Sequence, residues 1–171
     1  MAARVDKPMI NRQSKNRVYR QGFTLIEILI VVVILGILAS IVIAQFRDAS
    51  DDAVRATFLI NGKTFVESAM RFRLDTGQFL EDSSSGALPA GFEQYVQAEK
   101  WVGGTPIGGV WDAELNSFGI TSALGVHFNG SGATRDDAYM VQLDAAVDDG
   151  DLATGGFRKI AGDRYYFIIV D

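Results

Sequence analysis

The sequence predicts an α+β fold in which one long N-terminal helix packs on a small antiparallel sheet, and three observations predict it. An uncharged apolar run extends from Ile28 to Phe46, and hydrophobic residues continue at helical spacing to about Leu74. No proline interrupts residues 9–88, so one helix of roughly 50 residues is expected. The segment 164–170 (RYYFIIV) is typical of a strand. The 171 residues therefore divide into a long helix and a head of about 100 residues.

Composition excludes several classes of function. The chain has no cysteine, which excludes disulfides, thiolate metal sites and a cysteine nucleophile. Residues 1–22 hold six basic residues and one acidic residue, whereas the rest of the chain is strongly acidic and brings the net charge to -5. Nucleic-acid binding is not expected, because an acidic body repels phosphate.

The apolar run predicts a membrane-spanning helix. Its 19 residues form about 28 Å of helix, close to the ~30 Å hydrocarbon core of a bilayer. Basic residues favour the cytoplasmic side, so we expect a cytoplasmic N-terminus and an acidic body on the far side. Two alternatives are a secretory signal peptide cut after Ala44, although its apolar region would be unusually long, and an ordinary uncleaved anchor.

Glu27 distinguishes this segment from both alternatives. A carboxylate in the centre of a membrane helix costs about 2.5–3.5 kcal/mol, and less near the interface. Such a charge is expected to have a partner. The simpler interpretation places Glu27 among lipid headgroups, where the positive end of the helix favours it.

Residues 20–27 (RQGFTLIE), followed by ILIVVVILGILASI, closely resemble the prepilin cleavage and methylation signature of type IV pilins and type II secretion pseudopilins. The resemblance implies that a membrane aspartyl peptidase cuts between Gly22 and Phe23 and methylates the new amine of Phe23. It also implies that Glu27 pairs with the Phe23 amine of a neighbouring subunit during assembly.

The chemistry of these residues agrees with that role. Methylation keeps the positive charge of the amine. Phe23 and Glu27 of one subunit lie four residues apart, or about 6 Å of helix rise, so the amine of a staggered neighbour fits better. Glycine at position 22 leaves the scissile bond open to a peptidase.

The expected organisation has four parts: a removed leader (1–22), a transmembrane and filament-core helix (23–46), its amphipathic continuation (47–75) and a globular head (76–171). Gly36 and Asn61-Gly62 are points where the helix is expected to bend or fray. The expected elements of the head are a short helix within 91–101, a glycine-rich turn at 101–111, a strand at 117–128, a helix or strand at 137–147 and a strand at 164–170.

An acidic turn follows residue 143. Four carboxylates surround Gly150, belonging to Asp144, Asp148, Asp149 and Asp151. The resemblance implies a calcium ion near Asp148, Asp149 and Asp151, because some major pseudopilins bind calcium in a late loop. The spacing is not that of an EF-hand, so it favours a solvated acidic turn, with no resident cofactor.

Three other features are given structural interpretations. The stretch GGTPIGG (103–109) lacks the lysine of a phosphate-binding loop and is interpreted as an ordinary loop. The only histidine, His127, has no serine and aspartate at a spacing that indicates a triad. Tyr165, Tyr166 and Phe167 are expected in the core and on the sheet surface.

The sequence therefore predicts a structural subunit, not an enzyme: a pseudopilin of a type II secretion filament. A type IV pilus subunit or minor pilin is the alternative, and a membrane-anchored extracytoplasmic enzyme or binding module is a second. Expected partners are other pilin-like subunits, prepilin peptidase, an inner-membrane assembly platform and membrane lipid. The expected location is the bacterial inner membrane with a periplasmic head, and then a periplasmic or extracellular filament.

Overall fold

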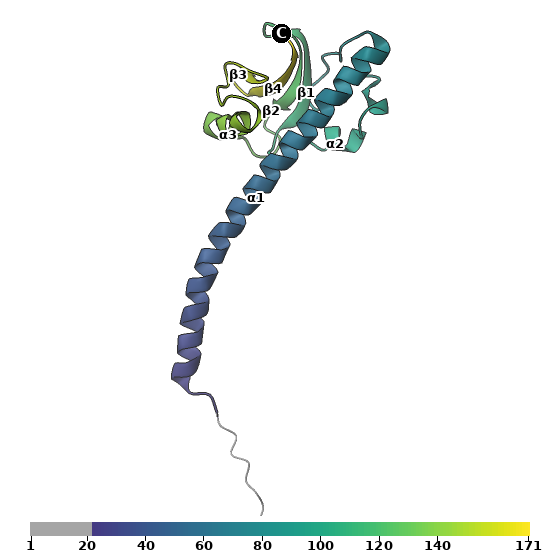
Figure 1. Cartoon of the computed structure of the whole chain (residues 1–171). Helices are drawn as coiled ribbons and strands as arrows, with labels where there is room; N and C mark the ends of the chain where they lie inside the picture. The colour runs from purple at the N-terminus through teal and green to yellow at the C-terminus, as the bar shows by residue number, and fades with distance from the viewer. Residues whose placement is uncertain (1–21) are drawn as a thin grey trace, which may run out of the picture. The chain divides into compact units, whose positions relative to one another are not determined.

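The computed structural model describes residues 22–171, so residues 1–21 of the predicted leader lie outside the described residues. The chain divides between Ala44 and Gln45 into two compact units. Helix α1 (Leu25–Thr76) contributes to both, and its second half packs on a four-stranded antiparallel sheet (Figure 1). The α+β class predicted from the sequence is therefore confirmed.

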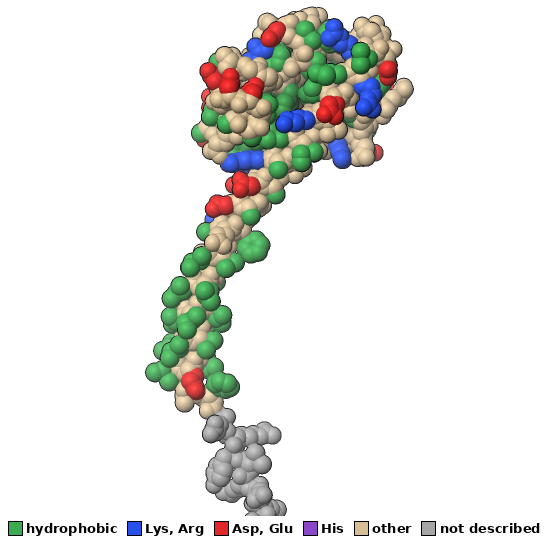
Figure 2. Space-filling view, viewed as in Figure 1, with side chains coloured by type: hydrophobic (Ala, Val, Ile, Leu, Met, Phe, Trp, Pro, Cys, Tyr) green, Lys and Arg blue, Asp and Glu red, His purple; other side chains and the backbone are tan. Residues whose placement is uncertain are grey.

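The N-terminal part of α1 exposes its apolar side chains. Every residue from 22 to 53 is exposed, and the large apolar side chains from Leu25 to Phe46 keep between 45% and 87% of their surface accessible. Hydrophobic side chains cover this segment in Figure 2. By length and composition the helix is able to cross a bilayer.

The second half of α1 buries a single stripe. Its buried positions follow one another at intervals of three or four residues, as on one face of a helix: Phe58, Gly62, Phe65, Ala69 and Phe72. The Phe58 ring stacks on Trp111 with centroids 5.2 Å apart, and the Phe65 ring meets Trp111 edge-on at 4.9 Å. An aromatic core therefore joins helix and sheet.

Gly62 has a packing role where the sequence predicts a weak point. Helix α1 continues through both Gly36 and Gly62. A Cβ at position 62 would lie 2.2 Å from Cε2 of Phe167. The glycine thus lets the helix backbone approach the sheet closely. The helix ends where Gly77, with φ of 74°, donates its amide to the Arg73 carbonyl.

The sheet contains β1 (Val110–Ser117), β2 (Ile120–His127), β3 (Phe157–Ala161) and β4 (Arg164–Val170) in the order β1-β2-β4-β3. All neighbouring strands are antiparallel. Helix α3 (Asp137–Val147) connects β2 to β3, and the short helices η1 (Phe92–Gln94) and α2 (Ala98–Val102) lie in the connection between α1 and β1.

Several boundaries differ from the sequence prediction. The segment 137–147, left open between helix and strand, is a helix. The strand predicted at 117–128 is β2 alone, because Phe118 and Gly119 have positive φ and form a two-residue hairpin turn. Strands β1 and β3 were not predicted, and Trp111 lies in β1 and not in the glycine-rich turn.

The two faces of the sheet differ in polarity. Trp111, Tyr165 and Phe167 belong to the aromatic core against α1, whereas Tyr166 clusters with Ile120 and Ala123. The acidic residues of β1 that alternate with Trp111 therefore lie on the face opposite α1. This second face carries the polar network described below.

The glycine-rich loop uses its amides within the protein. The amide of Thr105 donates to Gly109 O, Gly108 to Thr105 O, and Gly109 to Ser131 O. A Cβ at Gly108 would lie 2.0 Å from the Ala133 carbonyl oxygen, so only glycine fits there. These contacts favour a structural loop over a phosphate cradle.

Candidate functional site

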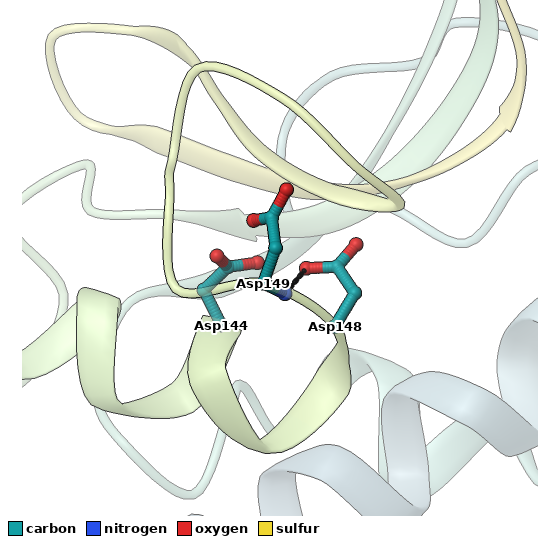
Figure 3. Close-up of side chains that lie close together, drawn as sticks. All are labelled: Asp144, Asp148 and Asp149. Carbon is teal, nitrogen blue, oxygen red and sulfur yellow. Dashed lines mark hydrogen bonds between the residues drawn. The ribbon is translucent and has the colours of Figure 1, made fainter.

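Three carboxylates converge where α3 ends (Figure 3). Asp144, Asp148 and Asp149 each place one oxygen within 4.8 Å of the others. The Asp148 carboxylate accepts the amides of Asp149 and Gly156, and the Asp149 carboxylate accepts the Thr154 hydroxyl at 2.8 Å. Asp148 and Asp149 thus also organise the following loop.

Asp144 differs from its two neighbours. It is fully buried, and neither of its carboxylate oxygens has a hydrogen-bond partner among the described residues. Burial, followed by the proximity of Asp148 and Asp149, raises the pKa of Asp144 to about 7. A proton or a cation is required to balance this carboxylate at low cost.

Asp151 is not a member of this carboxylate group. Its Oδ1 accepts the Ala153 amide at 3.0 Å, and its own amide donates to Asp149 at 2.9 Å. The group that could hold a metal therefore contains Asp148 and Asp149 of the predicted set, together with Asp144. Oxygen ligands of this type suit calcium, and the orphaned buried oxygens of Asp144 fit such an ion.

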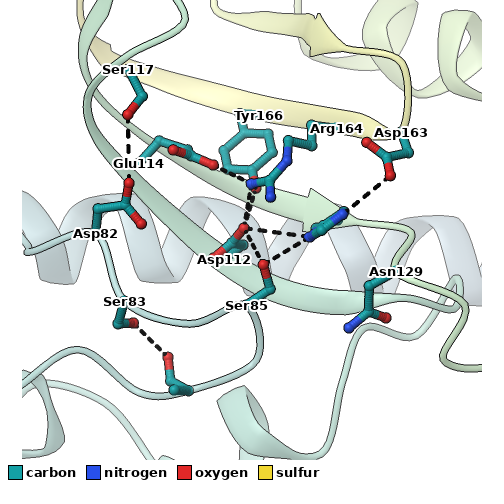
Figure 4. Close-up of polar contacts among 12 residues, drawn as sticks. Asp82, Ser83, Ser85, Asp112, Glu114, Ser117, Asn129, Asp163, Arg164 and Tyr166 are labelled. Carbon is teal, nitrogen blue, oxygen red and sulfur yellow. Dashed lines mark hydrogen bonds and ion pairs between the residues drawn. The ribbon is translucent and has the colours of Figure 1, made fainter.

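A second polar cluster lies on the sheet face opposite α1 (Figure 4). Asp112 Oδ2 accepts hydrogen bonds from Arg164 Nη1 at 2.7 Å and from the Tyr166 hydroxyl at 2.7 Å. The same guanidinium nitrogen of Arg164 bonds Glu114. Asp112 and Glu114 are 2% and 4% exposed, so two buried carboxylates share one cation.

The burial of this cluster affects its protonation. Desolvation raises the pKa of Glu114 to about 7, against the opposing effect of Arg164. Desolvation also raises the pKa of Tyr166, and the charge and hydrogen bond of Asp112 act in the same direction. Glu114 therefore takes up a proton more readily than an exposed glutamate.

The structure brings a serine and an aspartate to His127, which sequence spacing did not indicate. Ser85 Oγ lies 2.8 Å from His127 Nδ1, and His127 Nε2 lies 3.2 Å from Asp163 Oδ2. Ser85 Oγ also lies 2.9 Å from Asp112 Oδ2 and donates to it. These residues are 42 and 36 positions from His127, so only the sheet topology brings them together.

The N-terminal segment carries the predicted processing residues. Gly22 and Phe23 are exposed and precede α1. Apart from the chain neighbours of Gly22, no atom of a described residue lies within 4 Å of a Cβ built there. Thr24 donates its amide and hydroxyl to Glu27 Oε2 at 2.7 and 2.8 Å, and the Glu27 amide donates to Thr24 Oγ1 at 3.3 Å. This reciprocal arrangement is a capping box at the start of the helix.

The family model described as the prokaryotic N-terminal methylation motif matches residues 17–43. The chain carries the type IV pilin and pseudopilin signature. The matched segment includes the capping box and most of the exposed apolar half of α1.

The signature points to a pilin-like structural subunit anchored in a membrane by its apolar helix. It also implies assembly with other pilin subunits and processing by prepilin peptidase in general. Cleavage between Gly22 and Phe23, methylation of Phe23 and pairing of Glu27 remain predictions at the residue level.

Proposed function

We propose that this pilin-like chain is a pseudopilin, a structural subunit of a type II secretion-type filament. The observation that carries the proposal is the exposed apolar half of α1, which begins with the single carboxylate of Glu27. Within the described residues, nothing covers this apolar surface. In the filament, the equivalent helices of other copies cover it.

Processing precedes assembly in this proposal. Prepilin peptidase cuts after Gly22 and removes the leader, residues 1–22, and the new Phe23 amine is methylated. The cut removes six basic residues and leaves one ammonium group at the head of the helix. That ammonium is the smallest countercharge for one carboxylate in an apolar environment.

Assembly then exchanges one apolar environment for another. Packed helices replace lipid tails by each other's side chains, so extraction from the bilayer costs little hydrophobic free energy. The Phe23 ammonium of one subunit pairs with Glu27 of its neighbour. The pair acts as a register device, because one buried charge without its partner costs far more than the intact pair contributes.

Two features favour a secretion-type filament over a type IV pilus subunit or minor pilin. The chain has no cysteine for the C-terminal disulfide loop that is frequent in surface pili. The carboxylate of Glu27 suits an ordinary or major subunit, since a tip subunit has no neighbour beyond it. A membrane-anchored extracytoplasmic enzyme or binding module is the rival class.

The proposed location is the inner membrane, with the N-terminus in the cytoplasm and the head in the periplasm, followed by a periplasmic or extracellular filament. The proposed partners are prepilin peptidase, an assembly platform in the inner membrane and other pilin-like subunits.

Intact-mass measurement of the membrane-extracted protein separates these proposals. Loss of residues 1–22 with one added methyl group supports the filament subunit. A full-length chain, or a chain cut after Ala44, overturns it in favour of an anchored module or a secreted protein.

We also propose that Asp144, Asp148 and Asp149 hold a structural calcium ion. Three carboxylates supply oxygen ligands, and the fully buried Asp144 has no other partner among the described residues to neutralise it. The ion would fasten the loop after α3 to the end of the helix. Its effect is on stability, and it takes no part in a reaction.

Thermal unfolding of the full chain in detergent, with calcium and with EDTA, tests this ion. Calcium is expected to raise the Tm of the wild-type protein, and Asp144→Asn should abolish that rise. Asp151→Asn is the matched control, because asparagine keeps an acceptor for the Ala153 amide, and its calcium response should stay normal. A wild-type Tm that does not respond to calcium would exclude the site.

A further inference from the structure

A groove opens beside the end of α1, where the helix packs on the sheet. It has a volume of about 490 Å³ and is lined by Met70, Arg73 and Leu74 of α1, by Gly77 just after the helix and by Ile169 of β4. Met70 and Leu74 keep 46% and 85% of their surface accessible. A groove of this size holds a large side chain, and its walls are mostly apolar.

The rim of the groove is positively charged. Arg73 forms part of the wall, with its guanidinium 4.1 Å above the centre of the Phe79 ring, and the exposed Arg71 lies on the neighbouring side of the helix. None of the ion pairs among residues 22–171 involves Arg71 or Arg73. The one acidic residue of 70–77, Asp75, accepts the Tyr95 hydroxyl at 3.1 Å. The groove therefore suits an apolar side chain that carboxylates accompany.

An earlier segment of α1, residues 46–52, has this character. The ring of Phe46 is 72% exposed. Three exposed acidic residues follow it: Asp48, Asp51 and Asp52. Asp52 lies 3.9 Å from Arg55, whereas the other two form no ion pair within the described part of the chain. The segment thus complements the groove in both hydrophobicity and charge.

The groove and Phe46 of one chain cannot meet. Both belong to the compact unit Gln45–Asp171, and the continuous helix α1 holds Phe46 about 36–42 Å of helix rise before Met70 and Leu74. Lipid around the apolar run does not reach the groove either, because the run ends at Phe46 and a headgroup layer is only about 5–8 Å deep. The occupant that these observations favour is a second copy of the chain.

We propose that Phe46 of one subunit docks in the groove of a second copy, with Asp48 and Asp51 beside Arg73 and Arg71. This contact rests on the proposed function, since it is one contact of the assembled filament. The two helices are then parallel and offset by about 36–42 Å. Each docked subunit still offers a free groove and a free Phe46, so the contact extends into an open filament and does not close into a dimer.

Cysteine cross-linking of full-length chains in isolated filaments tests this contact, because the chain has no cysteine of its own. Ala49→Cys keeps Phe46 and places a thiol on the same side of the helix, and Leu74→Cys places one at the groove. A short bismaleimide tolerates more thiol positions than a disulfide does. It should join chains that carry both substitutions into a ladder of dimers, trimers and longer oligomers, and neither single variant should give a ladder.

Ile60→Cys provides the matched control for register. Ile60 is 64% exposed and lies on the same helix, about 21 Å of helix rise before Leu74. A chain that carries Ala49→Cys and Ile60→Cys should therefore stay unlinked. Linking as strong as that through Leu74→Cys would overturn the proposal.

Charge reversal tests the rim of the groove. In the chain with Ala49→Cys and Leu74→Cys, Arg73→Glu should lower the cross-linked fraction about fivefold or more, because it places like charges opposite each other. Adding Asp48→Lys should restore the ladder. A cross-linked fraction that Arg73→Glu leaves unchanged would overturn the proposed contact.

A readout without cysteine covers the case in which the thiol variants fail to assemble. Phe46→Ala should lower the yield of filaments, since it removes the docking side chain. Ile60→Ala truncates a similarly exposed apolar side chain outside the groove and should leave the yield normal. Equal yields of the two variants would contradict docking by Phe46.

Maleimide labelling of Leu74→Cys separates the possible occupants. The thiol should react in the membrane form of the protein and become protected in filaments. Protection already in the membrane form would indicate lipid or another part of the same chain and would overturn the proposal. Filaments that form without the ladder overturn this contact and leave the proposed function intact, whereas a wild-type chain that forms no filaments contradicts the proposed function itself.

Discussion

Both halves of α1 carry apolar side chains that need a hydrophobic partner, and they find that partner in different places. From residue 22 to 53 every side chain is exposed, including the apolar run, whereas the stripe from Phe58 to Phe72 is buried against the aromatic core of the head. The second half therefore has its hydrophobic partner inside the chain. The first half requires a partner from outside it, and in the proposed function that partner is first lipid and then other subunits.

The acidic residues show the same contrast. Asp112 is buried and has Arg164 beside it in the same chain. Glu27 is exposed, and among residues 22–171 its carboxylate bonds only Thr24, in a neutral capping contact. Asp112 is thus neutralised within its own chain, whereas the proposed partner of Glu27 belongs to another subunit.

The largest expected effect follows from blocking the cleavage that removes the leader in front of α1. Gly22→Leu places a large side chain at the predicted scissile bond, so uncut precursor should accumulate in the membrane and filaments should be absent. Gly36→Leu is the matched control, since it adds the same side chain within the same exposed segment and should leave processing normal. Immunoblots of membrane fractions measure both, and wild-type processing of Gly22→Leu would contradict the assignment.

The second effect concerns the charge of Glu27. Glu27→Val and Glu27→Gln should both be cut normally and yet fail to assemble or assemble in disorder, because both lack the charge that pairs with Phe23. Thr24→Ala removes both hydroxyl contacts of the capping box, leaves the amide of residue 24 and keeps the charge of Glu27, so it should assemble. The yield of sheared filaments measures assembly of each variant. If Glu27→Gln assembles and Thr24→Ala does not, the role of Glu27 is helix capping and not charge pairing.

The third effect compares two phenylalanines on the same helix. Phe58→Ala removes a buried ring that stacks on Trp111, and it should lower the free energy of unfolding of the head by about 3–5 kcal/mol. Phe46→Ala removes a ring that is 72% exposed and should leave head unfolding within about 0.5 kcal/mol of wild type. Denaturation followed by tryptophan fluorescence measures both, and equal losses would contradict the division of α1.

The smallest effect tests the internal charges of the head. The pKa of Glu114 is raised to about 7, so the folded state holds a proton that the unfolded state releases at lower pH. Glu114 should therefore lower the free energy of unfolding by about 1–3 kcal/mol as pH rises from 4.5 to 7. Glu114→Gln should make the fall smaller by that amount and leave the part that comes from Asp144, whose pKa is also raised to about 7. Denaturant titrations across this range measure the slope. An unchanged slope in the variant would show that Glu114 does not contribute to it.

Local pattern was sufficient to predict the long helix and strand β4. Both have uninterrupted periodic or apolar sequences, and the predicted end of the helix differs from Thr76 by two residues. Strand β1 was missed because Asp112 and Glu114 alternate with Trp111 and Ala113, and buried acidic side chains resemble a solvated loop in sequence. Strand β3 is only five residues long and contains two basic residues.

The candidate sites show where sequence reasoning ends. Asp144 and Asp148 lie four residues apart at the end of a helix, so assignment of 137–147 as a helix would have grouped them. The association of His127 with Ser85 and Asp163 depends on strand register and on the path of the connection between α1 and β1, and no local spacing indicates it. The N-terminal signature was recognisable because its residues are contiguous.

The distance between the Phe23 amine of one subunit and the Glu27 carboxylate of its neighbour, measured in a high-resolution structure of purified filaments, tests the central claim most directly. We predict methylated Phe23 as the first residue of every subunit, with its nitrogen within ion-pair distance, about 4 Å, of a neighbouring Glu27. A Glu27 carboxylate that faces open solvent, or has no ammonium group within reach, would contradict the account.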